Sequence, residues 1–69
     1  MIQVLNNQDG TWTVINSENL KIAKIVRIYD KDAKRGYYYR VDDHEGITKK
    51  DRIDYFQSAR GFCYDLIKS

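Results

Sequence analysis

The chain has 69 residues, a formal net charge of +2 and 13% aromatic residues, among them six tyrosines. A chain of this length buries only about 60% of the surface that its unfolded form exposes, so a deep catalytic cleft is not expected. A single cysteine excludes an internal disulfide, and no apolar run approaches membrane-spanning length. The N-terminal segment lacks the basic and apolar regions of a secretory signal. We therefore expect a single compact domain over residues 1–69, located in the cytoplasm.

Residues 2–15 are expected to form a β-hairpin. Two segments rich in β-branched residues, Ile-Gln-Val-Leu and Thr-Trp-Thr-Val-Ile, flank a turn-forming Asn-Asn-Gln-Asp-Gly. Side chains alternate between the two faces of a strand, so register decides which of them face a core. In one register the inward-facing side chains are apolar: Ile2, Val4, Trp12 and Val14. Leu5 and Ile15 then lie on the outer face, which indicates a covering surface or a partner.

Residues 17–29 fit either a helix or a strand. A helix would begin at an N-cap on Ser17 and stop at Gly36. Its apolar stripe would contain Ile22, Ile25, Val26, Tyr29 and Ala33. The β-rich run at 25–29, however, is followed by a turn and then by a matching β-rich run, which favours a strand.

Residues 25–42 predict a second antiparallel hairpin with a basic turn. A slip of the register by one residue moves every side chain to the other face. We expect Asp30 to lie opposite Tyr37, because this pairing gathers apolar side chains on one face. These are Val26, Ile28, Tyr39 and Val41. The alternative register would mix Tyr38 and Arg40 into that face.

The same pairing predicts a binding surface on the opposite face of the hairpin. There Arg27 would face Arg40, and Tyr29 would face Tyr38. Two arginines directly opposite each other repel, and an acidic partner would relieve that repulsion. Tyrosine and arginine are also enriched at interface hot spots. Together with the turn, the predicted binding residues are Arg27, Tyr29, Tyr38, Arg40, Lys31, Lys34 and Arg35.

The charge of the chain is unevenly placed. Residues 21–40 contain seven basic and two acidic residues, a local charge of +5. Three acidic residues follow at once: Asp42, Asp43 and Glu45. A basic stripe beside an acidic corner forms a dipolar surface, which differs from the overall basicity of a dedicated nucleic-acid-binding protein.

After the acidic turn, residues 52–56 are expected to form a further strand, followed by a C-terminal helix. Ser58 would be the N-cap of this helix. Its apolar face would contain Ala59, Phe62, Cys63, Leu66 and Ile67. The predicted fold class is therefore α+β, a small antiparallel meander of four or five strands with one C-terminal helix packed on one face.

The residue types that carry chemistry are sparse in this chain. His44 lies among carboxylates in the acidic turn, but neighbouring side chains of a turn rarely converge on one metal ion. Cys63 lies on the apolar face of the predicted helix, where a cysteine usually behaves as a small hydrophobe. The charged run at 49–52 is typical of a solvated segment. We therefore predict no catalytic residue, no metal site and no cofactor.

These observations predict a small non-enzymatic protein that docks on a partner protein with an acidic surface. Small inhibitors from phages and mobile elements, such as anti-CRISPR proteins, share this size and class, and the likeness extends no further. The alternative is a nucleic-acid-binding regulatory domain that uses the basic hairpin. A third possibility is a homodimer formed through Leu5 and Ile15 or through an open sheet edge. A membrane partner is not expected.

Overall fold

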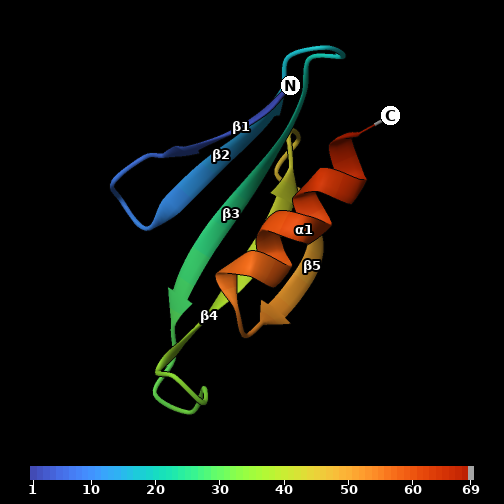
Figure 1. Cartoon of the computed structure of the whole chain (residues 1–69). Coiled ribbons are helices and arrows are strands. Elements are labelled where there is room, and N and C mark those ends of the chain that lie inside the picture. The colour runs from blue at the N-terminus through green and yellow to red at the C-terminus, as the bar shows by residue number, and fades with distance from the viewer. Residues whose placement is uncertain (69) are drawn as a thin grey trace.

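The computed structural model describes residues 1–68, in which one helix packs on one face of a five-stranded antiparallel sheet (Figure 1). The elements are β1 (Ile2–Asn6), β2 (Thr11–Asn16), β3 (Lys21–Tyr29), β4 (Tyr37–Asp43), β5 (Thr48–Ile53) and α1 (Phe56–Ile67). Strand order follows chain order, so each strand pairs with its sequence neighbours. The predicted α+β meander with a C-terminal helix is confirmed.

The side chains of the first hairpin lie on the faces expected from sequence. Val4 pairs with Val14, and Trp12 lies on the same face of β2 as Val14. Leu5 and Ile15 lie on the outer face, where Leu5 is 46% exposed. Alternation of apolar and polar residues thus predicts which side chains of this hairpin face the core.

The ambiguous segment forms strand β3, so the helical interpretation of residues 17–29 is wrong. Ala23 and Ile25 are fully buried beneath α1, whereas Lys24 between them is exposed. β3 is the central strand of the sheet and is hydrogen-bonded to β2 on one side and to β4 on the other. Side chains along β3 alternate between the two faces of the sheet, as in any strand.

The predicted register of the β3–β4 hairpin is wrong by one residue. Tyr29 pairs with Tyr37, and Ile25 pairs with Val41. The turn is closed by a hydrogen bond in which the Asp30 N–H donates to the Gly36 carbonyl, so Asp30 faces Gly36 and not Tyr37. The physical reason lies in β2, which aligns its own inward-facing residues with Ala23 and Ile25. Both faces of β3 carry apolar residues, and the pairing with β2 decides which set enters the core.

The last two elements begin earlier than the sequence predicts. β5 spans Thr48–Ile53, so the strand predicted at 52–56 is wrong in position. Its pairing with β4 shifts register, and Arg52 has a φ of 53°, which marks an irregular end. α1 begins at Phe56 after the N-cap Tyr55, so the N-cap predicted at Ser58 is wrong.

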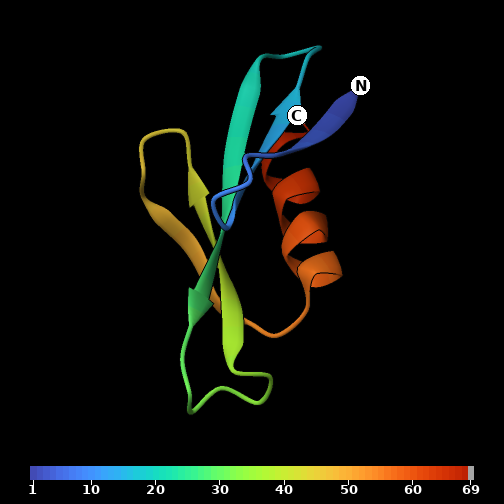
Figure 2. The same ribbon diagram turned by 90° about the vertical axis from the view of Figure 1, so that its left-hand side faces the viewer.

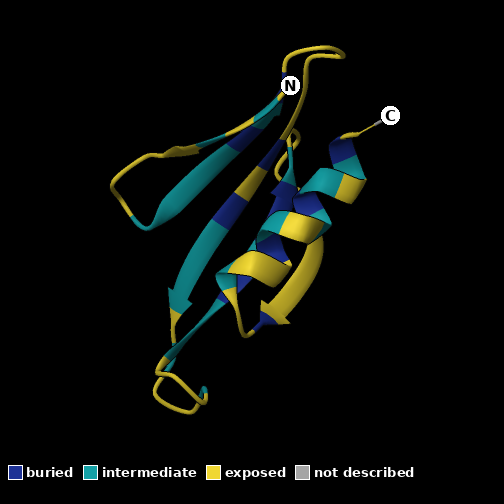
Figure 3. Ribbon diagram, viewed as in Figure 1, coloured by how far each residue is buried: buried dark blue, intermediate teal, exposed yellow. Residues whose placement is uncertain are grey.

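The core lies between α1 and the central strands (Figure 3). The buried residues of α1 are Ala59, Cys63 and Ile67, with Phe62 and Leu66 packed half-buried at their sides. The end of the helix is held by two side-chain amides, because Asn16 and Asn19 both donate hydrogen bonds to the Ile67 carbonyl, at 3.0 and 2.8 Å. These bonds fix the C-terminal turn of α1 to the β2–β3 connection.

Candidate functional site

The β3–β4 hairpin projects beyond the first turn of α1 at one end of the molecule (Figures 1 and 2). Its turn carries three predicted binding residues, Lys31, Lys34 and Arg35, and all three side chains are exposed. The guanidinium of Arg35 lies over the ring of Tyr55, 4.7 Å from its centroid, which connects the turn to the segment before α1.

The observed register divides the other four predicted binding residues between the two faces of the sheet. Arg27 and Tyr29 alternate with Ile28 along β3 and lie on the face that α1 covers in part. Tyr38 and Arg40 lie on the opposite face. The predicted common face of Arg27, Tyr29, Tyr38 and Arg40 is therefore wrong, because it depended on the register that the structure excludes.

Arg40 is paired within the fold. Its Nε and Nη2 atoms donate hydrogen bonds to the two carboxylate oxygens of Asp42, each at 3.0 Å. The Thr48 hydroxyl donates to the same carboxylate at 3.0 Å, and Asp42 is buried. Arg40 lies opposite Val26, so the predicted repulsion between Arg27 and Arg40 does not occur. These contacts indicate that Arg40 compensates the charge of the buried Asp42 carboxylate.

Tyr38 is covered by Arg52 from β5. The Arg52 guanidinium lies 5.0 Å from the centroid of the Tyr38 ring, and its Nη1 atom lies 3.9 Å from a carboxylate oxygen of Asp30. On the sheet, Tyr38 pairs with Ile28. This face of the hairpin is thus occupied by contacts within the chain.

Arg27 has a different environment, because its guanidinium lies among aromatic rings. Its central carbon is 5.1 Å from the centroid of Trp12, 5.2 Å from Tyr37 and 5.7 Å from Tyr39. Nη1 donates a long hydrogen bond of 3.4 Å to the Tyr29 hydroxyl. Hydrogen bonds to tyrosine hydroxyls raise the pKa of Arg27 above its ordinary value, and the bond to Tyr29 contributes most. Arg27 therefore stays cationic.

Arg27 lacks a carboxylate partner among residues 1–68. None of the ion pairs in that part of the chain includes it, and its buried Nε atom has no hydrogen-bond acceptor there. A guanidinium has five donors, and the bond from Arg27 Nη1 to the Tyr29 hydroxyl is of marginal length. Arg40 and Arg27 thus differ in the property that matters for binding: the first is neutralised and the second is not.

Aromatic rings build the surface around Arg27. The Trp12 ring packs edge-on against Phe56 at 4.9 Å and against Tyr39 at 6.0 Å. Tyr39 is buried in the core, and Phe56 packs against it. Tyr37 contacts Tyr29 edge-on at 6.2 Å, and Tyr29 is 72% exposed. We call the resulting surface the arginine–aromatic surface; its members are Trp12, Arg27, Tyr29 and Tyr37.

The sequence interpretation missed two members of this surface. The sequence predicts Trp12 as an inward-facing residue, and in the structure it is half-buried. Tyr37 was placed opposite Asp30. Their proximity to Arg27 depends on the registers of β2, β3 and β4 together, and no single hairpin contains that information.

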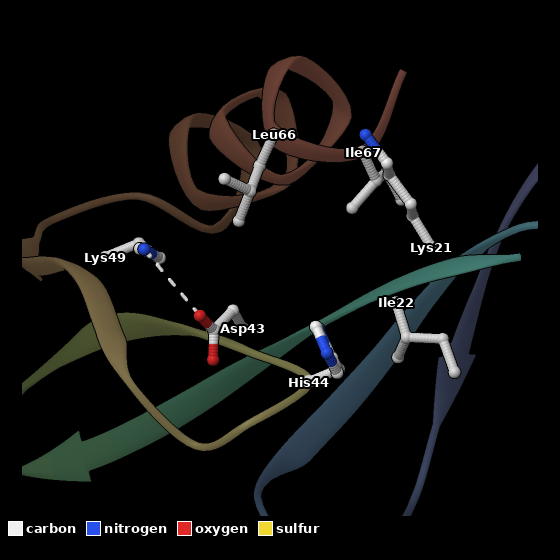
Figure 4. Close-up of a pocket in the computed structure, with 7 residues that line it drawn as sticks. All are labelled: Lys21, Ile22, Asp43, His44, Lys49, Leu66 and Ile67. Carbon is white, nitrogen blue, oxygen red and sulfur yellow. Dashed lines mark ion pairs between the residues drawn. The ribbon is translucent and has the colours of Figure 1, made fainter. Parts of the chain in front are cut away.

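A shallow cavity of about 220 Å³ lies at the other end of the sheet (Figure 4). It is lined by Lys21, Ile22, Asp43, His44, Lys49, Leu66 and Ile67. Asp43 accepts hydrogen bonds from the backbone N–H groups of Ile47 and Glu45 and lies 3.7 Å from the Lys49 ammonium. The bond from Ile47 is the main cause of the lowered pKa of Asp43. The carboxylate thus serves the β4–β5 turn.

The remaining chemistry-bearing side chains form no reactive cluster in the described residues. Among residues 1–68, no group of three potential metal-ligating side chains lies together. The Cys63 thiol is fully buried on α1, and burial raises its pKa to about 12. A thiol with this pKa is protonated at neutral pH and is a poor nucleophile.

Comparison with known proteins gives no relative: no family model, no curated protein and no solved structure matches the chain. Within residues 1–68, α1 is too short and too polar to cross a membrane.

Proposed function

We propose that the protein is a non-enzymatic binding module that docks on a partner protein through the arginine–aromatic surface, and that the docked surface of the partner is acidic. The observation that carries this proposal is the Arg27 guanidinium, which is held among three rings and has no carboxylate partner in the described residues. A carboxylate of the partner would accept hydrogen bonds from the terminal Nη groups of this guanidinium. Charge-assisted hydrogen bonds of this kind are shorter and stronger than neutral ones.

The rings around Arg27 support the proposal because they fix the guanidinium before a partner arrives. Stacked rings restrict the rotamers of a long side chain, so less conformational entropy is lost when it binds. Tryptophan, tyrosine and arginine are the residues that dominate binding energy at interfaces. Trp12, Arg27, Tyr29 and Tyr37 bring all three types together on one face.

The projecting turn supports an acidic partner for a separate reason. Lys31, Lys34 and Arg35 are exposed next to the surface and extend its positive charge. Charges at the rim of an interface chiefly raise the association rate and exclude partners of the same sign. We therefore expect binding to slow at higher ionic strength, with the charged turn responsible for most of that effect.

Affinity capture tests the proposal. The immobilised full chain is incubated with lysate of its source cells, once with nuclease and once without, and the retained proteins are identified. A protein with an acidic surface that is retained equally in both arms, and that is lost with Arg27→Met, supports the proposal. Methionine keeps the length of the side chain among the rings and removes the charge.

Arg52→Met is the matched control for this capture, because it removes one arginine of β5 that lies over Tyr38 on the opposite face of the sheet. It should retain the partner. Equal loss with both variants would contradict the proposal, since net charge rather than the arginine–aromatic surface would then control binding.

The projecting basic hairpin also favours a second function, binding to single-stranded nucleic acid. The exposed Tyr29 ring could stack on a base, and Lys31 and Lys34 could contact phosphates. Affinity for a labelled oligonucleotide should then fall steeply with salt, with a slope set by the number of phosphates contacted. Retention in the capture experiment that nuclease abolishes would favour this function over the first.

A further inference from the structure

The two edges of the sheet differ in how they are protected. β5 carries four consecutive charged residues at 49–52, its pairing with β4 shifts register, and Arg52 has a positive φ. Charges and bulges of this kind prevent an edge from pairing with another chain. β1 contains no charged residue and no proline, and it pairs with β2 without a register shift. β1 is therefore an open edge.

The hydrogen-bond pattern shows which backbone groups of β1 are available. The Ser17 N–H donates to the Met1 carbonyl, and the Asn7 N–H donates to the Thr11 carbonyl, both at 3.0 Å. In an antiparallel ladder the bonded pairs alternate, so residues 1, 3, 5 and 7 bond to β2. The N–H and carbonyl groups of Ile2, Val4 and Asn6 therefore point away from the sheet. Among residues 1–68, no other backbone bond includes these groups.

We propose that β1 pairs with β1 of a second copy of this chain, antiparallel and with a two-fold axis at Val4, to form a continuous ten-stranded sheet. In this register Val4 pairs with Val4 of the second copy, and Ile2 pairs with Asn6. Each pair exchanges two hydrogen bonds, so the outward groups of all three residues are satisfied in both copies. On the outer face, Leu5 of one copy lies opposite Gln3 of the other. An isologous interface requires such self-complementarity.

The size of the contact sets its strength. A strand of this length spans about 17 Å, and the edge contact is smaller than the roughly 1,200 Å² that stable interfaces bury. The dimer is therefore weak and depends on concentration. Leu5 at 46% exposure lies at the seam and provides the apolar part of the contact. Since β1 carries no charge, no like-charge pair opposes the association.

Sedimentation equilibrium over a concentration series tests this pairing. For the wild type we expect the average mass to rise from 8.2 kDa toward twice that value. Gln3→Lys combined with Leu5→Lys places like charges opposite each other across the two-fold axis and should raise the dissociation constant at least about tenfold. Gln3→Glu combined with Leu5→Lys places opposite charges there and should restore dimers. Ile47→Lys, in an exposed turn distant from β1, is the control and should dimerise like the wild type.

Amide exchange provides a readout that does not depend on any variant. In the dimer the Val4 amide is protected at high concentration and exchanges rapidly on dilution, whereas the Gln3 and Leu5 amides are protected throughout because they bond to β2. A wild type that remains monomeric up to about 1 mM, corresponding to less than about 4 kcal/mol of association free energy, would overturn the proposal. Dimers that the doubled lysine variant leaves unchanged would also overturn it.

Discussion

Two arginines on neighbouring strands have opposite roles in this fold. Arg40 compensates a buried carboxylate, whereas Arg27 is surrounded by rings and has no acid beside it in the described residues. The sequence predicts both arginines on one exposed binding surface. The difference arises from a register slip of one residue, which reverses the faces of the β3 side chains relative to those of β4.

Arg40→Ala is expected to destabilise the fold. It leaves the Thr48 hydroxyl as the remaining side-chain donor to the buried Asp42 carboxylate, and a buried carboxylate oxygen that loses its partner costs about 1–3 kcal/mol. Urea denaturation followed by the fluorescence of Trp12 measures the change. Arg40→Met combined with Asp42→Asn should recover part of the loss. A urea midpoint for Arg40→Ala equal to that of the wild type would show that the pair contributes nothing to stability.

Cys63 is expected to make the fold less stable at alkaline pH. Its pKa is raised by burial to about 12 from an ordinary value of 9.0, so the unfolded chain loses the thiol proton first. The contribution is fully present below pH 9 and is lost as pH rises from 9 to about 12. Cys63→Ala removes this dependence, and the difference between the two stability curves isolates it. A difference that is flat between pH 9 and 12 would contradict the assignment.

At the scale of elements, α1 is held to the sheet by a narrow row of buried residues, Ala59, Cys63 and Ile67. Ile67 is 2% exposed, and truncating a buried isoleucine to alanine typically costs 2–5 kcal/mol. A domain of this size has about 5 kcal/mol of stability, so Ile67→Ala should leave it largely unfolded by circular dichroism. Phe62→Ala should cost less, because Phe62 is only half-buried. The reverse order would mean that α1 packs on a different face.

The sequence was sufficient for the elements whose two faces differ in polarity. The inward faces of β1 and β2 followed from alternation, and α1 followed from its apolar stripe with an error of three residues at its start. The β3–β4 register did not follow, because β3 has apolar residues on both faces. Ile25 faces the core, whereas Val26 and Ile28 face outward. The pairing of β3 with β2 decides which set faces inward. Alternation within the β3–β4 hairpin alone does not reveal it.

The candidate site was predictable only in part for the same reason. Residue type indicated Arg27, Tyr29 and the basic turn, since these residue types are common at interfaces. The contacts of Trp12 and Tyr37 with Arg27 require three strands to be in register at once. The pairing of Arg40 with Asp42 requires the fold of the β4–β5 turn, which also brings Thr48 to the carboxylate. The residue pattern of a single strand therefore predicts neither set of contacts.

At the scale of the whole molecule, the proposed interactions use different parts of the sheet. The arginine–aromatic surface lies where β2, β3 and β4 meet the first turn of α1, and the open edge is β1. A dimer through β1 would add a strand next to Asn6, the pairing partner of Trp12, whereas Arg27, Tyr29 and Tyr37 lie on strands further from this edge. Two linked surfaces could engage a symmetric or repetitive partner together, which raises the apparent affinity without any new contact.

We propose that the arginine–aromatic surface supplies most of the energy with which the protein binds its partner. The most direct measurement is isothermal titration of the captured partner with the wild type and with two pairs of variants. Arg27→Met and Tyr29→Ala should each weaken binding at least about tenfold, or roughly 1.4 kcal/mol, as expected for hot spots. Arg52→Met and Tyr38→Ala, on the opposite face, should each change the dissociation constant less than about threefold. Weaker binding by Arg52→Met and Tyr38→Ala, with unchanged binding by Arg27→Met and Tyr29→Ala, would contradict the proposed role of the arginine–aromatic surface.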